Sequence, residues 1–221
     1  STNIMDKDQN YLFFGGSTIW GVGVNDKETI PSIFSKTYNV NTKNYGESAY
    51  TARQSLALLS NLYILNSINN DRKNTIIFYD GVNEISTKCR IENDLIATTY
   101  EQTLQTAMAG ENLQLYFSKI LEPALDFIKI FKEKFFKNKN INNNFYDCHN
   151  NKEKAFKVAE SLIETWRLAA EITKKNNDKF VAILQPNAFI GKPNIDYLQN
   201  LKNDEIFYKQ YLAVYPIMQD L

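Results

Sequence analysis

Short apolar runs alternate along this chain with longer stretches of helical periodicity, and this alternation limits the fold more than any other feature. The short runs are rich in aromatic and β-branched residues and end near glycine, asparagine or proline, which is typical of strands. We predict strands over Tyr11–Phe14, Thr37–Tyr45, Asn74–Asp80 and Lys179–Gln185, of which Thr37–Tyr45 is the weakest and is expected at an edge.

The stretches between these runs carry apolar residues at three- and four-residue intervals, which predicts amphipathic helices. We expect helices over Ala52–Leu65, Ile96–Phe136, Glu153–Lys175 and Asp204–Leu221. Strands that alternate with helices favour a mostly parallel sheet covered on both faces. The sequence therefore predicts an α/β fold as one domain over residues 1–221, with a polar, exposed loop or insertion around residues 138–154.

The charge balance gives no sign of a nucleic-acid or membrane partner. The chain has 25 basic and 25 acidic residues, so its formal net charge is zero. No apolar run approaches the roughly 18 residues of a membrane helix. No signal peptide is evident, although a processed N-terminus would look the same, so the compartment stays open and includes the periplasm and the exterior. Without a phosphate-binding loop or a metal-ligand motif, we expect no cofactor and no metal.

Two cysteines, Cys89 and Cys148, are too few for a metal site and are far apart in sequence. We favour two unrelated thiols. The alternative is a disulfide that ties two loops together, which would indicate an oxidising compartment.

Three small or polar residues stand where predicted strands end. Ser17 follows the first strand, Gly46 ends the second and Asn83 follows the third. In a parallel sheet these carboxyl ends share one edge, where functional sites lie. Taken singly, Ser17 is a helix cap, Gly46 a turn glycine and Asn83 a loop asparagine. Together they match the needs of acyl transfer, because a serine nucleophile requires donors that stabilise an oxyanion.

The motifs around these residues resemble those of SGNH (GDSL-type) hydrolases, a family of serine esterases and lipases. The resemblance rests on Phe14–Gly21, Asn44–Thr51 and Tyr79–Glu84, in this order. It implies a three-layer, flavodoxin-like α/β/α fold, with Ser17 as nucleophile and with Gly46 and Asn83 as oxyanion donors. Gly16 stands where the family usually has aspartate, and Glu84 stands where aspartate is commoner.

The chain departs from this family in lacking an Asp-x-x-His segment, which supplies the catalytic base. Its one histidine, His149, lies in the polar loop before the Lys179–Gln185 strand, and we interpret it as a surface histidine. Two explanations stay open. In the first, the sequence ends before the last family segment, which the similarity of its tail to the helix preceding that segment favours. In the second, the domain has lost its base.

The resemblance implies a small-molecule ester substrate, which could be a lipid ester, a thioester or an O-acetylated carbohydrate. The lack of a large exposed apolar segment weighs against an interfacial lipase. Alternatives are an O-acyltransferase acting on a glycan, an inactive binding domain on the same fold, and a flavodoxin-like signalling or cofactor domain. The aromatic residues Trp20, Tyr50 and Tyr79 could line a pocket, although we expect them in the core. The oligomeric state stays open.

Overall fold

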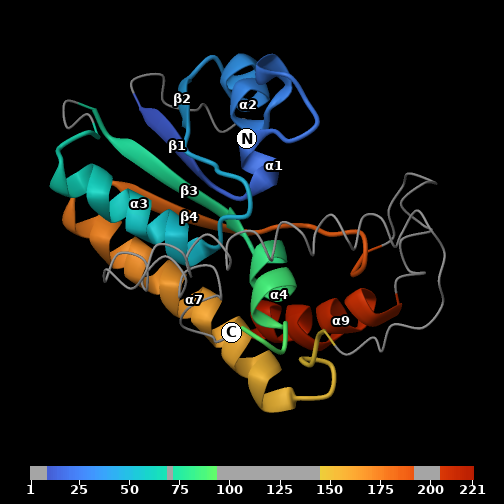
Figure 1. The fold of residues 1–221 in the computed structure, drawn as a ribbon. Coiled ribbons are helices and arrows are strands. Elements are labelled where there is room, and N and C mark those ends of the chain that lie inside the picture. The colour runs from blue at the N-terminus through green and yellow to red at the C-terminus, as the bar shows by residue number, and fades with distance from the viewer. Residues whose placement is uncertain (1–8, 69–71, 94–144, 192–204) are drawn as a thin grey trace, which may run out of the picture.

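A computed structural model describes residues 9–68, 72–93, 145–191 and 205–221 of the chain. Its centre is a four-stranded sheet in the order β2-β1-β3-β4, in which every neighbouring pair is parallel (Figure 1). The strands are β1 (Asn10–Gly15), β2 (Asn41–Asn44), β3 (Asn74–Asp80) and β4 (Lys179–Leu184). This order is that of the first four strands of a flavodoxin-like sheet.

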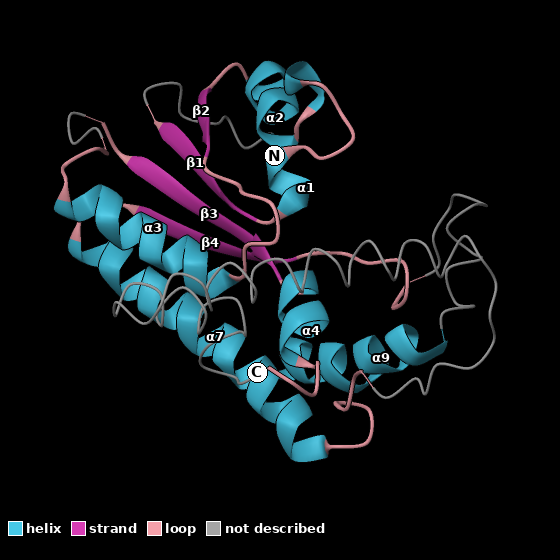
Figure 2. Ribbon diagram, in the orientation of Figure 1, coloured by secondary structure: helices cyan, strands magenta, loops and turns pink. Residues whose placement is uncertain are grey.

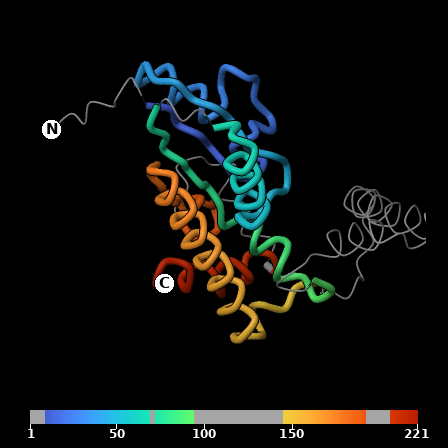
Figure 3. The backbone as a smooth tube through the Cα atoms, turned by 90° about the vertical axis from the view of Figure 1, so that its left-hand side faces the viewer, coloured from blue at the N-terminus to red at the C-terminus, as the bar shows by residue number. Residues whose placement is uncertain are grey.

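Helices cover both faces of the sheet, so the described residues form an α/β/α arrangement (Figure 2). On one face lie α1 and α2, and on the other lie α3 and α7, which run side by side in Figure 3. The helical elements are α1 (Ser17–Trp20), the 3-10 turn η1 (Asp26–Glu28), α2 (Ile30–Tyr38), α3 (Ala52–Ile64), α4 (Val82–Lys88), α7 (Lys152–Lys175) and α9 (Glu205–Asp220).

The alternation of side chains along β1 and β3 builds a separate core on each face of the sheet. Leu12, Phe14, Ile76 and Phe78 pack with Leu59 and Ala169, which come from α3 and α7. Tyr11, Phe13 and Ile77 pack on the other face with Ile19 of α1 and with Phe34 of α2. Both strands are buried on both sides, which explains their nearly continuous apolar sequence.

A third apolar cluster joins α4, α7 and α9 beyond the end of the sheet. Cys89 and Cys148 belong to this cluster, where they form a disulfide, and both residues are buried. The interpretation as two unrelated thiols is therefore wrong. The bond ties the C-terminal end of α4 to the loop before α7 across 59 residues of sequence, a link that no spacing rule could reveal.

Most predicted elements are confirmed with small shifts of their ends. The strand Asn74–Asp80 has the predicted bounds, and α3, α7 and α9 end within a few residues of the predicted limits. The edge strand is shorter than expected, because Thr37 and Tyr38 belong to α2. Helix α2 was not predicted, although Thr29 caps it and Pro31 stands in its first turn, both of which are ordinary start signals.

Some predictions lie partly or wholly beyond the described residues. The expected helix Ile96–Phe136 lies almost wholly outside them, and the polar loop is described only from Phe145 onward. There its interpretation as an exposed loop holds for Phe145 but not for buried Cys148, and Lys152 already begins α7. None of the described helices is long and apolar enough to cross a membrane.

Candidate active site

The carboxyl ends of β1 and β3 mark the point where the strand order of the sheet reverses. From β1 the chain continues to β2 on one side, and the sheet then resumes at β3 on the other side of β1. Open α/β sheets bind their ligands at such a point, beyond the carboxyl ends of the strands. Ser17 begins α1 directly after β1, and Asn83 lies in the first turn of α4 directly after β3. The fold therefore brings both predicted residues to this edge.

Asn83 packs directly against the residue that precedes Ser17. A β-carbon built on Gly16 would lie only 2.2 Å from Asn83 Nδ2, so only glycine leaves room for this carboxamide. Asn83 Nδ2 donates a hydrogen bond of 2.7 Å to the backbone carbonyl of Tyr50. Since the amide group carries two hydrogens, a second one is available to a ligand beside Ser17.

Gly46 lies under the end of α1. A β-carbon on Gly46 would come within 2.5 Å of the Trp20 backbone nitrogen, so this close packing requires glycine. Its amide donates to Asn44 Oδ1 at 2.9 Å, and Asn44 Nδ2 donates in turn to the Ile19 carbonyl at 2.8 Å. The Asn44 side chain thus joins the end of β2 to α1 and occupies the Gly46 amide.

Glu84 fixes the start of α4, the helix that carries Asn83, a role that the sequence did not reveal. Its carboxylate is fully buried and accepts bonds from the Gly81 amide at 2.8 Å and from the Ala52 amide at 2.6 Å. It therefore joins the turn after β3 to the beginning of α3, next to Tyr50. In the sequence, the only indication of this role is that an acidic residue directly follows Asn83 just after a predicted strand.

Asp80, the last residue of β3, is a second buried carboxylate close to Glu84. Its Oδ2 accepts a bond of 3.1 Å from Trp166 Nε1, whereas Oδ1 has no partner within the described part of the chain. Burial raises the pKa of Asp80 well above its ordinary value, and the neighbouring Glu84 charge raises it further. The two side chains are enclosed in the core and do not form an open carboxylate pair of the glycosidase type.

Gln185 adds a polar side chain from the end of β4, which the sequence interpretation had treated only as part of a strand. Its Nε2 donates to Thr18 Oγ1 at 2.8 Å, and its backbone amide donates to the Asp80 carbonyl at 2.7 Å. The Tyr215 hydroxyl of α9 donates to the Gln185 carbonyl. Gln185 therefore connects β3, α9 and the first turn of α1.

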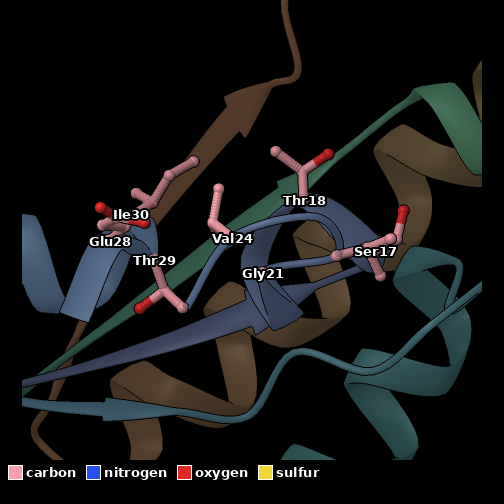
Figure 4. A pocket seen from close by; sticks show the side chains of 8 residues that line it. Ser17, Thr18, Gly21, Val24, Glu28, Thr29 and Ile30 are labelled. Atoms are coloured by element: carbon pink, nitrogen blue, oxygen red, sulfur yellow. The ribbon is translucent and has the colours of Figure 1, made fainter. Parts of the chain in front are cut away.

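Ser17 is half-buried and borders a pocket of about 340 Å³. The pocket lies between α1 and the first turn of α2, and Figure 4 shows Thr18, Val24 and Ile30 along it. No hydrogen bond to Ser17 Oγ is present among the described residues. Trp20 is 53% exposed and is not a core residue, in contrast to our expectation.

His149 does not contact Ser17 and is bonded to Gln210 of α9 instead. Its Nδ1 lies 2.7 Å from Gln210 Nε2, and its backbone amide donates to Gln210 Oε1 at 3.1 Å. The loop that carries it precedes α7 and lies beyond α4, away from α1, in Figure 1. His149 is only partly buried, as a loop histidine is expected to be, but its ring is engaged with α9.

The described ranges contain no group of three or more His, Cys, Asp or Glu side chains that could hold a metal ion.

Comparisons with known proteins give similarity at the level of solved structures only. No protein-family model matches the sequence, and no curated protein matches it. The chain is similar to a member of the lipolytic protein G-D-S-L family from Veillonella parvula, with 15% identity and a TM-score of 0.33 over 72% of this chain and 98% of that one. It is also similar to AlinE4, an SGNH-hydrolase family esterase, with 16% identity and a TM-score of 0.34 over 91% of this chain and 96% of AlinE4. These superpositions are loose and assign no role to any residue of this chain.

Proposed function

We propose that this protein cleaves small esters through a serine nucleophile, Ser17. The observation that carries the proposal is the contact between Gly16 and Asn83 at the reversal point of the sheet. It places a carboxamide with an available hydrogen beside a half-buried serine that borders a pocket. A nucleophile, a donor for an oxyanion and space for a substrate are the elements that acyl transfer needs.

In the proposed reaction Ser17 Oγ attacks the carbonyl carbon of the ester and forms a tetrahedral intermediate. The negative charge on the former carbonyl oxygen accepts hydrogen bonds from Asn83 Nδ2 and from the Ser17 amide. The bond to the alcohol then breaks, and the proton lost by Ser17 ends on the departing alcohol. Water hydrolyses the acyl-serine, which releases a carboxylic acid and restores the serine hydroxyl.

Gly46 can act as an oxyanion donor in this proposal only if its amide is first released from its present partner. Its amide faces Asn44 Oδ1, so it can donate to an oxyanion only after this 2.9 Å bond is released. Its lasting contribution is the close packing of its backbone under α1, which fixes the position of the Ser17 turn.

His149 has no part in the proposed reaction. Both its backbone amide and its ring are engaged with Gln210 on α9. A serine without a histidine partner loses several orders of magnitude in rate, although oxyanion stabilisation and binding still leave measurable catalysis. We therefore expect slow turnover in this chain alone.

The test is labelling with a fluorophosphonate probe, followed by mapping of the modified peptide and by turnover of p-nitrophenyl acetate. We expect one adduct on Ser17, with labelling abolished by Ser17→Ala. Ser48→Ala is the matched control, because Ser48 is an exposed serine of a nearby loop. His149→Ala should label at the parent rate. Absence of labelling and of turnover in the parent protein would overturn the proposal and favour an inactive binding domain.

A further inference from the structure

Helix α1, which begins with Ser17, is too short to fix its own orientation. It has four residues, Ser17–Trp20, whereas isolated helices shorter than about 12 residues are marginal in water. Its N-cap residue is Gly16, which has no side chain to accept from the first amides, and no acidic residue lies in its first turn. The orientation of Ser17 therefore depends on contacts that other elements make with α1.

Two of these contacts act on Ile19, two residues beyond Ser17. The Ile19 side chain is fully buried in the cluster that contains Phe13 and Ile77. The Ile19 carbonyl accepts a bond of 2.8 Å from Asn44 Nδ2, at the end of β2. These contacts hold α1 from below and from the β2 side of the sheet.

Gln185 supplies a contact with the first turn of α1 from the other direction. Its Nε2 donates to Oγ1 of Thr18, the residue directly after Ser17, at 2.8 Å. Gln185 directly follows β4, and the strand order is β2-β1-β3-β4. The bond therefore reaches across the end of β3 to the turn that follows β1. Asn44 and Gln185 thus hold α1 from opposite directions along the sheet.

The main chain of Gln185 is itself fixed at both of its polar groups. Its amide donates to the Asp80 carbonyl at 2.7 Å, and its carbonyl accepts from the Tyr215 hydroxyl of α9. The next residue is Pro186, whose ring further restricts the backbone of the residue before it. The carboxamide of Gln185 is therefore carried by a well-fixed backbone, and its bond to Thr18 can restrict the movement of α1.

We propose that Gln185 is a positioning residue for the nucleophile and acts through Thr18, an assignment that rests on the proposed function of Ser17. Gln185 does not touch the ester in this reaction. Its bond to Thr18 is exposed to solvent, so loss of the bond should change the free energy of unfolding little. Attack on a carbonyl carbon, in contrast, requires close alignment of the reacting atoms. Loss of the bond should therefore lower kcat and leave KM nearly unchanged.

The test measures kcat and KM for p-nitrophenyl acetate in Gln185→Leu, in Thr18→Val and in the double variant. Each single variant should lower kcat by about tenfold, with KM within about twofold and Tm within about 2 °C of the parent values. The double variant should be no more than about twofold slower than either single variant, because all three remove the same bond. Thr18→Ser keeps the hydroxyl and should recover most of the kcat that Thr18→Val loses.

Thr42→Val is the matched control for Thr18→Val. Thr42 Oγ1 donates to the Pro31 carbonyl at 3.2 Å, so this variant also removes a hydroxyl bond between two elements, here β2 and α2. It makes the same chemical change away from the first turn of α1 and should keep parent kcat within about twofold.

Amide hydrogen exchange is a second readout that does not depend on catalysis. The amides of Gly21 and Val22 donate to the Ser17 carbonyl at 2.9 and 3.0 Å, so their exchange reports opening of α1. We expect Gln185→Leu and Thr18→Val to raise this exchange at least about fivefold and the control to leave it unchanged. Faster exchange together with no ester turnover in the parent protein would overturn the esterase function and keep the bond as the support of α1. Unchanged kcat, additive losses in the double variant, or unchanged exchange would overturn the positioning role.

Discussion

The edge of the sheet around Ser17 and the loop around His149 differ in how their polar groups are used. At the sheet edge, Asn83 keeps one hydrogen available and Ser17 Oγ has no partner among the described residues. In the loop, His149 is bonded to Gln210 through backbone and ring, and the neighbouring Cys148 is fixed by a disulfide. One region keeps polar groups available beside a pocket, whereas the other uses them to hold α4, α7 and α9 together.

This difference teaches that a histidine is not a catalytic candidate merely because it is the only one in the chain. The geometry associates His149 with the cluster that surrounds the disulfide, and it associates Ser17 with Gly16 and Asn83. The two regions should therefore respond independently to substitution, because distant sites without shared partners usually have additive effects.

Removal of the disulfide should have the largest effect on stability. A cross-link between residues 59 apart restricts the unfolded chain, and its loss typically costs about 2–4 kcal/mol. We expect Cys89→Ala/Cys148→Ala to lower Tm by about 5–15 °C in thermal unfolding followed by circular dichroism. At temperatures well below this Tm, the rate of Ser17 labelling should stay within threefold of the parent rate.

The prediction that the two regions respond independently would be wrong if the double variant remained folded but lost Ser17 labelling. Reaction of both cysteines with a thiol reagent in the folded, unreduced protein would contradict the disulfide itself. Buried disulfides are typical of proteins that fold in oxidising compartments, so the same measurement bears on where this protein folds.

The second largest effect should come from Gly16→Ala. The φ of Gly16 is −84°, so its backbone accepts alanine, and the effect comes from contact alone. The new β-carbon would lie 2.2 Å from Asn83 Nδ2, which forces this carboxamide away from Ser17. Loss of one oxyanion donor lowers kcat by about 10²-fold or more, and partial displacement should lower ester turnover by about 10- to 100-fold.

Gly191→Ala is the matched control for this prediction, since the described residue nearest to a β-carbon at Gly191 is Asn187, whose carbonyl oxygen lies 4.0 Å away. It should keep parent activity and parent stability. Equal turnover in Gly16→Ala and Gly191→Ala would remove Asn83 from the proposed mechanism.

The sequence predicted the sheet better than the contacts that organise its edge. Asn74–Asp80 was predicted with its observed bounds, because a strand buried on both faces has a continuous apolar sequence that ends in a polar turn. The fold class alone assigns strand ends to one edge, so the position of Ser17 and Asn83 at this edge could be predicted, while their chemical roles stay predictions.

The remaining parts of the site depend on contacts between residues far apart in sequence. Glu84 accepts from Ala52, and Gln185 donates to Thr18, over separations of 32 and 167 residues. No local pattern encodes such pairs, because they depend on how α1, α3 and the ends of β3 and β4 pack. For the same reason the pairing of Cys89 with Cys148 could not be chosen from spacing.

The smallest expected effect concerns Asp80. This residue ends β3 at the sheet edge, and its side chain is bonded to Trp166 of α7. Its pKa is higher in the folded protein than the roughly 3.9 of an unfolded chain, because of burial and the Glu84 charge. The folded state therefore binds more protons. The stabilising contribution of Asp80 is complete below its unfolded pKa and is lost as the pH rises through the raised pKa.

Asp80→Asn removes this dependence, since asparagine carries no charge and its carbonyl can still accept from Trp166 Nε1. At neutral pH we expect the variant to be more stable than the parent by about 1 kcal/mol, or about 2–4 °C in Tm. The difference should shrink as the pH falls toward 4. A variant that is less stable at neutral pH, or a difference that grows on acidification, would show that the carboxylate is stabilised in its ionised form. Asp80 would then have a partner for its Oδ1 that compensates its burial.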